Sequence, residues 1–555
     1  MILGKDNIWR LPPPVGTSDW ATFSRDSYCV DKTLLIKELV DSRSRVVLFT
    51  RPRRFGKTTA LNMIRAFYEG ERSLFEDKKI WAAGEEYRKE QGSHPVIFLS
   101  FKDIKQTSAE EAFEKLTTVV ASEIGRYRES VENGFANDAK RDSLLHTLSR
   151  KPSKTELGES LGLLCEAIHL HRGVAPVILI DEYDQPITTA STYGFYDEMC
   201  SFMRVFLSGA LKDNEHCHIG IMTGVLRVAK EGILSGLNNP AVWTVFDESF
   251  AQYFGFTEEE VEAMAKYYGA ADKLPEIKAW YDGYDFGGTE IYNPWSVLQY
   301  FSHECKPDAY WLDTSSNDLI TEIVRDLPHD MVKTLEALLR NETPWVPMAK
   351  DLGPYKDIVR RKSSLFALLV SSGYLKVTSP IQKGGCQVAI PNHEIAQVFV
   401  DDIQEKINSH LSVGTGDIAG AIVLRDMPAL KSAIASFLLE SVSYFDAAAE
   451  GFFHGLTLGF LAVLRDEFRV LSNVESGEGR FDIALKPRVD GFPAFIIEVK
   501  AADGLGDDLK ALALDARQQI DGKKYDTTFR AEGIADIVKI GLAYYKDKVE
   551  LCSAP

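Results

Sequence analysis

The segment RVVLFTRPRRFGKTTALNMIRAFYEG, residues 45–70, contains three successive patterns that together indicate a fold class. Residues 45–50 form an apolar run typical of a buried strand, and residues 51–59 form a loop that contains Gly-Lys-Thr. From residue 60 onward the apolar side chains recur with helical spacing. Strand, loop and helix in this order predict a phosphate-binding loop in an α/β domain whose parallel sheet is flanked by helices.

The loop supplies candidate contacts to ATP and Mg²⁺. Gly56 permits close approach of the backbone to phosphate, and Lys57 is expected to reach the β- and γ-phosphates. Thr58 is the predicted Mg²⁺ ligand, and Thr59 belongs to the same nucleotide-binding set. The full signature has a glycine where this chain has Arg51, which we also include among the nucleotide-binding residues. Gly-Lys followed by Ser or Thr arises by chance roughly 0.3 times in a chain of this length, so the assignment needs a second motif.

That second motif is VILIDEYDQPI, residues 177–187, in which four apolar residues lead directly into two acids. A continuous apolar run is typical of a central parallel strand, and ligands gather at the carboxyl ends of such strands. Asp181 is expected to hold Mg²⁺ through water, and Glu182 to polarise the attacking water. The structural alternative is a solvated strand end followed by a turn, but pairing with the Gly-Lys-Thr loop favours the nucleotide site.

Two further apolar runs fit the same sheet, PVIFLSF at residues 95–101 and HIGIMTGVLR at residues 218–227. In the second, Thr223 is placed at a strand end as a sensor of the γ-phosphate, and Arg227 as a phosphate contact. A polar strand cap and a surface arginine are equally compatible with these two positions.

Four longer motifs resemble a known family. They are RPRRFGKTTALNMI, LIDEYDQPI, TGVLRVAKEGILSGLNN and WYDGYDFGGTEIYNPWSVL, and together with VDKTLLIKELV they extend over about residues 11–298. This pattern resembles the AAA-ATPase-like family, which implies an ATP-binding P-loop domain. Related ATPases commonly have glycine where this chain has Arg51. The aromatic motif could stack bases, although a packed inter-domain core is the more common use of such residues.

A second set of acidic residues lies near the C-terminus. GEGRFDIALKP, residues 477–487, predicts a strand that contains Asp482, and FPAFIIEVKAAD, residues 492–503, predicts another. Strand alternation places Glu498 and Lys500 on one face. Buried charges are unfavourable without a partner or a metal, so we interpret Asp482 and Glu498 as Mg²⁺ ligands and Lys500 as the group that orients the attacking water.

An Asp followed sixteen residues later by Glu-Val-Lys (482 to 498) resembles the PD-(D/E)XK nuclease superfamily. The resemblance implies an α/β restriction-endonuclease-like domain. It also implies an upstream metal ligand at Glu450 on the preceding helix, and a catalytic Gln519 with Tyr525 on a following helix.

Composition limits the class of protein further. The chain has 555 residues, which predicts about three or four domains. We place a P-loop domain at 1–250, a helical, winged-helix-like connector at 251–430 and the nuclease-like domain at 431–555. The net charge of −18 argues against a generally basic surface that coats nucleic acid, so any such contact is local. Seven scattered cysteines and the lack of a long apolar stretch predict a cytoplasmic protein that is not membrane-embedded.

The preferred functional interpretation is an ATPase whose nucleotide state controls Mg²⁺-dependent cleavage of nucleic acid, with DNA expected before RNA. The main alternative is a nucleotide-dependent switch with an inactive nuclease fold that binds nucleic acid or protein. Arg51 favours the switch, whereas the intact Asp482, Glu498 and Lys500 favour the enzyme. A small-molecule kinase lacks an evident acceptor site, and self-association into a homo-oligomer stays open.

Overall fold

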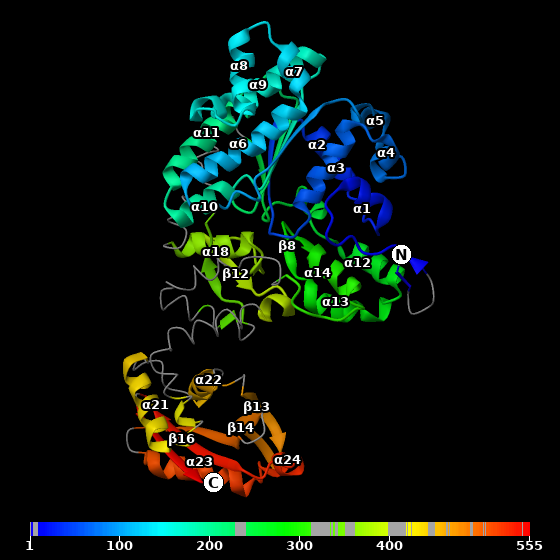
Figure 1. Ribbon diagram of the computed structural model, residues 1–555. Coiled ribbons are helices and arrows are strands. Elements are labelled where there is room, and N and C mark those ends of the chain that lie inside the picture. The colour runs from blue at the N-terminus through cyan, green and yellow to red at the C-terminus, as the bar shows by residue number, and fades with distance from the viewer. Residues whose placement is uncertain are drawn as a thin grey trace. The chain divides into compact units, whose positions relative to one another are not determined.

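The computed structural model describes most of the chain, and the described residues form two compact units, one within residues 2–397 and one within residues 418–554 (Figure 1). The described residues are 2–3, 9–227, 240–311, 334, 337–338, 342–349, 361–397, 418–441 and 450–554, apart from positions 419, 423, 462–463, 465–466, 489–491, 503, 505–506 and 547. The cysteines are all free thiols. Among the described residues, no helix has both the length and the apolar character needed to cross a membrane.

The first unit is built on a five-stranded parallel sheet with the order β4-β5-β6-β3-β7. The predicted apolar runs form its strands because their residues are buried on both faces of the sheet. The order places β6 between β3, which precedes the Gly-Lys-Thr loop, and β5, which carries the acidic pair. The strands are β3 (Val46–Thr50), β4 (Val96–Ser100), β5 (Val177–Asp181), β6 (Gly220–Gly224) and β7 (Ala241–Trp243).

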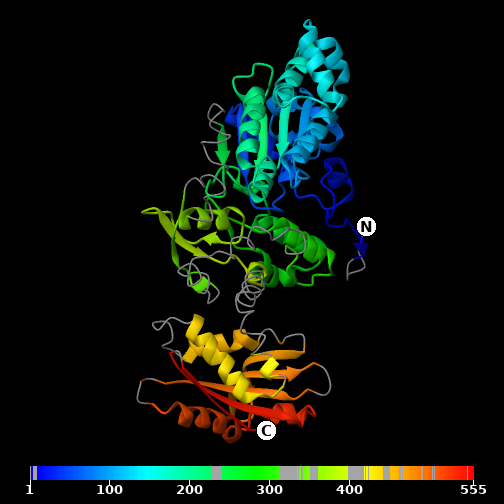
Figure 2. The same cartoon turned by 60° about the vertical axis from the view of Figure 1, so that its left-hand side comes forward.

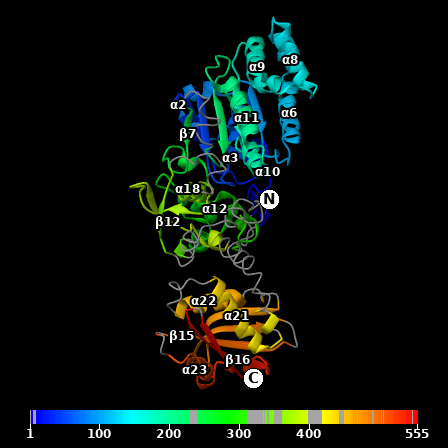
Figure 3. The same ribbon diagram turned by 90° about the vertical axis from the view of Figure 1, so that its left-hand side faces the viewer.

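Helices cover both faces of this sheet, as Figure 3 shows. Val46 and Leu48 of β3 face one core, and Val47 and Phe49 face the other, because successive side chains of a strand point in opposite directions. The first core is covered by α6 (Ala109–Arg126), α7 (Arg128–Gly134), α8 (Asp138–Leu148), α9 (Lys154–Arg172), α10 (Gln185–Tyr193) and α11 (Tyr196–Leu211). The second is covered by α1 (Trp20–Asp26), α2 (Leu34–Ser42), α3 (Lys57–Glu69), α4 (Lys79–Ala83) and α5 (Glu85–Glu90).

The remainder of the described first unit contains helices and three small antiparallel sheets, one of which pairs β1 (Ile2–Leu3) with β2 (Trp9–Arg10). The aromatic motif at residues 280–298 packs into a core with α12, which agrees with its interpretation as a packed element. Residues 228–239 and most of 312–360 lie outside the described residues, so the predicted winged-helix-like connector stays a prediction. The elements are α12 (Glu258–Tyr268), α13 (Leu274–Tyr281), β8 (Tyr284–Phe286), β9 (Thr289–Ile291), α14 (Pro294–Ser302), β10 (Trp345–Pro347), α18 (Lys362–Ser371), β11 (Lys376–Val377) and β12 (Gly385–Ala389).

The second unit is a mixed five-stranded sheet in the order β13-β14-β15-β16-β17, with helices on both faces (Figure 2). Strands β15 and β16 are parallel, and the other neighbours are antiparallel. Helix α23 lies directly on β16, since a Cβ atom at Gly541 would stand 2.1 Å from the carbonyl oxygen of Ala513. The elements are α21 (Met427–Ser441), α22 (Glu450–Leu461), β13 (Phe468–Ser476), β14 (Gly479–Pro487), β15 (Ala494–Ala501), α23 (Leu509–Gly522), α24 (Thr527–Ala531), β16 (Ile537–Tyr545) and β17 (Lys548–Ala554).

Candidate nucleotide and nuclease sites

The loop between β3 and α3 has the backbone form of a phosphate cradle. Gly56 has φ of +79°, and a Cβ atom at this position would have no described neighbour within 4 Å, so backbone conformation and not space is what favours glycine there. Helix α3 begins at the next residue, Lys57. The unpaired N–H groups of this first turn, together with the helix dipole, favour an anion at this position.

Lys57 is held across its own loop. Its Nζ donates to the carbonyl oxygens of Arg51 at 3.0 Å and Pro52 at 2.8 Å. The side chain is buried, and this burial lowers the pKa of the lysine, while the charges of Glu182 and Asp181 act in the opposite direction. The ammonium group is therefore positioned by main-chain acceptors without any ligand.

Asp181 connects the loop to the centre of the sheet. Its carboxylate is fully buried and accepts hydrogen bonds from Thr58 Oγ1 at 2.7 Å and from Thr223 Oγ1 at 2.7 Å. The sheet order explains this, because β6 lies between the strands that lead to the other two residues. A hydroxyl and a carboxylate are hard oxygen ligands that fit Mg²⁺. The structure thus brings together Thr58, Asp181 and Thr223, three residues that the sequence analysis assigns to the nucleotide site, and their roles toward ATP and Mg²⁺ stay predictions.

Glu182 follows directly after Asp181 and has a strained backbone, with φ of +53°. Positive φ in a non-glycine residue is uncommon and is often found at functional sites. Burial raises the pKa of Glu182, and the charge of Lys57 opposes this rise. The next turn is fixed by Asp184, which accepts the main-chain N–H groups of Val225 and Leu226 at 2.9 and 2.8 Å.

Arg51 occupies the position where the signature has glycine, and its side chain is buried in the core. Its Nη1 donates to the carbonyl oxygens of Thr50 and Trp243, both at 3.0 Å, and the guanidinium lies over the rings of Phe254 and Phe286. Burial lowers the pKa of Arg51 to about 9. The structure therefore gives the predicted nucleotide contact a packing role, because the Arg51 side chain extends toward β7, while its carbonyl oxygen accepts from Lys57 in the loop.

Two other predicted nucleotide contacts stay predictions. Thr59 lies in the first turn of α3. Arg227 is the last described residue before position 240, and most of the TGVLRVAKEGILSGLNN motif lies outside the described residues.

In the second unit, two carboxylates meet between neighbouring strands. Asp482 on β14 and Glu498 on β15 lie one step beyond the paired residues Ile483 and Ile497. The main-chain N–H of Asp482 donates to Glu498 Oε2 at 3.4 Å, and that of Val499 donates to Asp482 Oδ2 at 2.8 Å. Glu498 is only 4% exposed, and burial together with the charge of Asp482 raises its pKa to about 8. A bound cation would relieve this repulsion, so the pair fits a divalent metal.

Other predicted residues surround this pair. Gln519 on α23 donates to Glu498 Oε1 and lies 3.4 Å from the hydroxyl of Tyr525. Lys500, two residues beyond Glu498 on β15, forms an ion pair with Asp515 on α23. Sequence reasoning missed Asp515, because only the packing of α23 on the sheet brings it to Lys500.

Glu450 is the first residue of α22, but its side chain lies outside the described part of the structure. Its role as a metal ligand stays a prediction. Asn392 and Glu394 are residue types that can bind a metal, but their side chains form hydrogen bonds within the protein. Asn392 donates to the carbonyl oxygen of Asp282, and Glu394 accepts from Ser296 and from the main chain of Trp311.

These features define a two-part protein with an ATPase-type nucleotide site and a nuclease-type acidic site. Comparison with known families agrees. Residues 14–234 match the predicted AAA-ATPase family, and residues 448–554 match the PD-(D/E)XK nuclease superfamily. The chain carries these two domains in this order, which confirms the resemblance predicted from the motifs.

One similar protein is an uncharacterized protein in the vnfD 5'region of Azotobacter chroococcum mcd 1, 25% identical over 564 residues and covering 97% of both chains. A solved structure, the Walker-type ATPase of Pyrococcus abyssi, aligns with a TM-score of 0.36 and 14% identity, covering 68% of this chain and 97% of that one. Domains of the two matched kinds use a nucleotide and a divalent metal ion, which supports a hydrolase in general terms.

Proposed function

We propose that this protein is an ATPase that controls a Mg²⁺-dependent nuclease, and that the nuclease cleaves phosphodiester bonds in DNA. The observation that carries the proposal is the set of neighbouring residues Asp482, Glu498, Lys500 and Gln519 in the second unit. The same chain also has a nucleotide site in which Thr58 is hydrogen-bonded to Asp181. Without a bound cation, the carboxylates of Asp482 and Glu498 would repel each other and gain nothing for folding.

In the nucleotide site, each residue has a role that its position supports. The first turn of α3 and Lys57 bind the phosphates, and Thr58 with Asp181 holds the metal ion that accompanies ATP. Thr223 fixes the Asp181 carboxylate, and Glu182 orients the water that attacks the terminal phosphate. The raised pKa of Glu182 makes it a stronger base than an ordinary glutamate once it is deprotonated.

In the nuclease site, Asp482 and Glu498 hold the cation, and Gln519 fixes the orientation of Glu498. A divalent ion bound there stabilises negative charge on the phosphate and lowers the pKa of its water. Lys500 is placed on the same face of β15, where it orients the attacking water. With a net charge of −18, the protein binds the nucleic acid locally, where the cation reverses the acidic field.

The test is cleavage of supercoiled, linear and single-stranded DNA with Mg²⁺ or Mn²⁺, with and without ATP, by wild type and Glu498→Gln. Glu475→Gln is the matched control, because Glu475 is exposed on β13. We expect ATP-responsive cleavage by wild type and by the control, and its loss in Glu498→Gln. Equal cleavage by all three proteins would remove the proposed site. No cleavage of DNA or RNA by any of them would favour the nucleotide-dependent switch with an inactive nuclease fold.

A further inference from the structure

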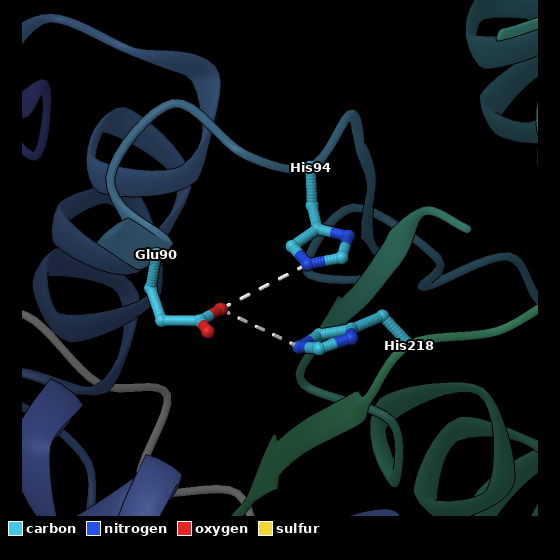
Figure 4. Close-up of side chains that lie close together, drawn as sticks. All are labelled: Glu90, His94 and His218. Carbon is cyan, nitrogen blue, oxygen red and sulfur yellow. Dashed lines mark ion pairs between the residues drawn. The ribbon is translucent and has the colours of Figure 1, made fainter. Parts of the chain in front are cut away.

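A cluster of three metal-ligand side chains lies at the opposite edge of the parallel sheet from the nucleotide loop. It consists of Glu90 at the end of α5, His94 just before β4 and His218 just before β6 (Figure 4). Both histidines precede their strands, whereas the nucleotide residues follow theirs. The amino ends of parallel strands share one edge of a sheet, so this cluster belongs to a different location from the predicted ATP site.

Both imidazole rings place their Nε2 atom near the same carboxylate oxygen. Nε2 of His94 lies 3.8 Å and Nε2 of His218 lies 3.9 Å from Glu90 Oε2. These distances are too long for hydrogen bonds, and Glu90 Oε2 is buried without a hydrogen-bond partner. A buried carboxylate oxygen that lacks a partner is unfavourable, so this group calls for a ligand between it and the two rings.

The hydrogen bonding of His94 fixes which nitrogen faces the cluster. Its Nδ1 lies 2.8 Å from the carbonyl oxygen of Ala175, and because a carbonyl only accepts, Nδ1 carries the proton. In the neutral ring, Nε2 then presents a lone pair toward Glu90. A main-chain carbonyl that holds the distal ring nitrogen is the usual support for a metal-binding histidine.

The imidazole ring of His218 is held in place by ring packing. His218 stacks on His94, with ring centroids 3.7 Å apart and an interplanar angle of 24°. The buried Tyr68 ring makes T-shaped contacts with both imidazoles. Both imidazole rings thus lie beside one carboxylate, and their packing restricts their orientation.

We propose that Glu90, His94 and His218 bind a divalent transition-metal ion of the zinc type, with solvent completing the coordination. Two imidazole nitrogens and one carboxylate oxygen suit Zn²⁺, whereas Mg²⁺ prefers oxygen ligands alone. The three candidate ligand atoms all lie within 4.8 Å of one another. Ligands of a tetrahedral zinc are roughly 3.4 Å apart, so binding draws the three side chains closer together and rotates the stacked rings until both nitrogens face the ion.

Such an ion would connect the segment between α5 and β4 to the start of β6. All three side chains are partly exposed, with fractions of 29% for Glu90, 15% for His94 and 37% for His218, although the Oε2 atom of Glu90 is itself buried. Because the cluster lies away from Lys57 and Asp181, its role is to stabilise this edge of the ATPase sheet and not to act on ATP.

The experiment uses the full chain with Glu498→Gln, which removes the carboxylate site of the second unit. Metal-stripped protein is titrated with Zn²⁺ in excess Mg²⁺, and bound zinc is measured by calorimetry. We expect one equivalent of tightly bound Zn²⁺ and a higher melting temperature. Adding His218→Ala should weaken binding by roughly 100-fold or more, since a direct ligand matters at least as much as its supporting partners. Adding His146→Ala instead, at an exposed histidine on α8, should leave binding unchanged.

Co²⁺ gives a second readout that does not depend on a histidine variant folding. In the chain with Glu498→Gln alone, four- or five-coordinate cobalt at this site should give a distinct visible absorption, whereas oxygen-only octahedral cobalt absorbs faintly. Zinc uptake that is equal in the His218→Ala and His146→Ala proteins would overturn the proposal. So would a failure of the Glu498→Gln chain to bind Zn²⁺ at micromolar concentration.

Discussion

Asp181 in the nucleotide site and Glu498 in the C-terminal site are both buried carboxylates, but the chain supplies them with different partners. Asp181 accepts two short hydrogen bonds, from Thr58 and Thr223. Glu498 accepts from Gln519 and lies beside a second carboxylate, Asp482, which contributes to its raised pKa. The side chains of the first site are held by hydrogen bonds within the protein, whereas in the proposed second site a bound cation would relieve the repulsion.

The two lysines repeat this difference. Lys57 is buried and donates to two main-chain carbonyl oxygens of its own loop. Because these acceptors belong to the backbone, no substitution of a neighbouring side chain removes them. Lys500 is paired with Asp515, a largely exposed side chain on a neighbouring helix. The nucleotide site therefore depends on local backbone geometry, and the nuclease site depends on packing between a sheet and a helix.

The largest expected effect is that of Lys57→Ala. Loss of the ammonium removes the positive charge that faces the phosphates, and such groups contribute roughly 10²–10³-fold to turnover. We expect ATP hydrolysis to fall by this factor, measured as phosphate release, while Mn²⁺ binding by the second unit is unchanged. Lys37→Ala is the control, because Lys37 forms an exposed ion pair with Asp41 on α2. Unaltered ATP affinity in Lys57→Ala would contradict the phosphate-binding loop.

The next effect concerns stability and pH at Glu498. Its folded pKa of about 8 exceeds the ordinary value of about 4.3, so the folded state binds more protons than the unfolded state between these limits. Stability contributed by this group is therefore lost as pH rises from about 5 to 8. In metal-free protein, Glu498→Gln should remove this loss and raise the melting temperature of the second unit at pH 8 by roughly 2–4 °C or more.

The matched comparison for this stability effect is Glu475→Gln, at an exposed position on β13. Mn²⁺ should stabilise wild type and the control but not Glu498→Gln. A wild-type melting temperature that is as independent of pH as that of Glu498→Gln would show that Glu498 is ionised without a metal.

Much of the fold could be predicted because apolar runs mark the parallel strands. The Gly-Lys-Thr loop and Asp181 could be found for the same reason, since each directly follows such a run. Glu498 and Lys500 were found from strand alternation together with a family resemblance. These residues share a feature, which is that adjacent sequence determines their local geometry.

Other features depend on tertiary packing and left no local signal. The direction of the Arg51 side chain is set by Trp243 and by two aromatic rings far along the chain. Asp515 reaches Lys500 only because α23 lies against the sheet. His94 and His218 precede different strands, and no spacing rule connects them before the sheet order is known.

A smaller effect is expected for Thr223→Val, which nearly preserves shape but removes one of the two donors to Asp181. The oxygen that loses its partner is fully buried, so stability should fall by about 1–3 kcal/mol in urea unfolding. ATP turnover should fall by roughly tenfold, which corresponds to about 1.4 kcal/mol in the barrier. Thr223→Ser retains the hydroxyl and should restore most of both. Full activity in the valine variant would show that Thr58 alone positions the carboxylate.

The smallest effect is expected for Asp515→Asn, which removes the ionic partner of Lys500 and leaves its neighbours in place. Asp515 is 63% exposed, and exposed ion pairs contribute about 0–1 kcal/mol, so stability should change little. Cleavage should change by less than about fivefold, because Lys500 itself remains on the face of β15 that carries Glu498, whereas Lys500→Ala should abolish it. The difference between wild type and Asp515→Asn in the salt dependence of cleavage reports on the pair, since exposed pairs are screened. A loss of 100-fold or more in Asp515→Asn would mean that Asp515 is itself required to hold the metal or the water, which would extend the carboxylate set from β14 and β15 onto α23.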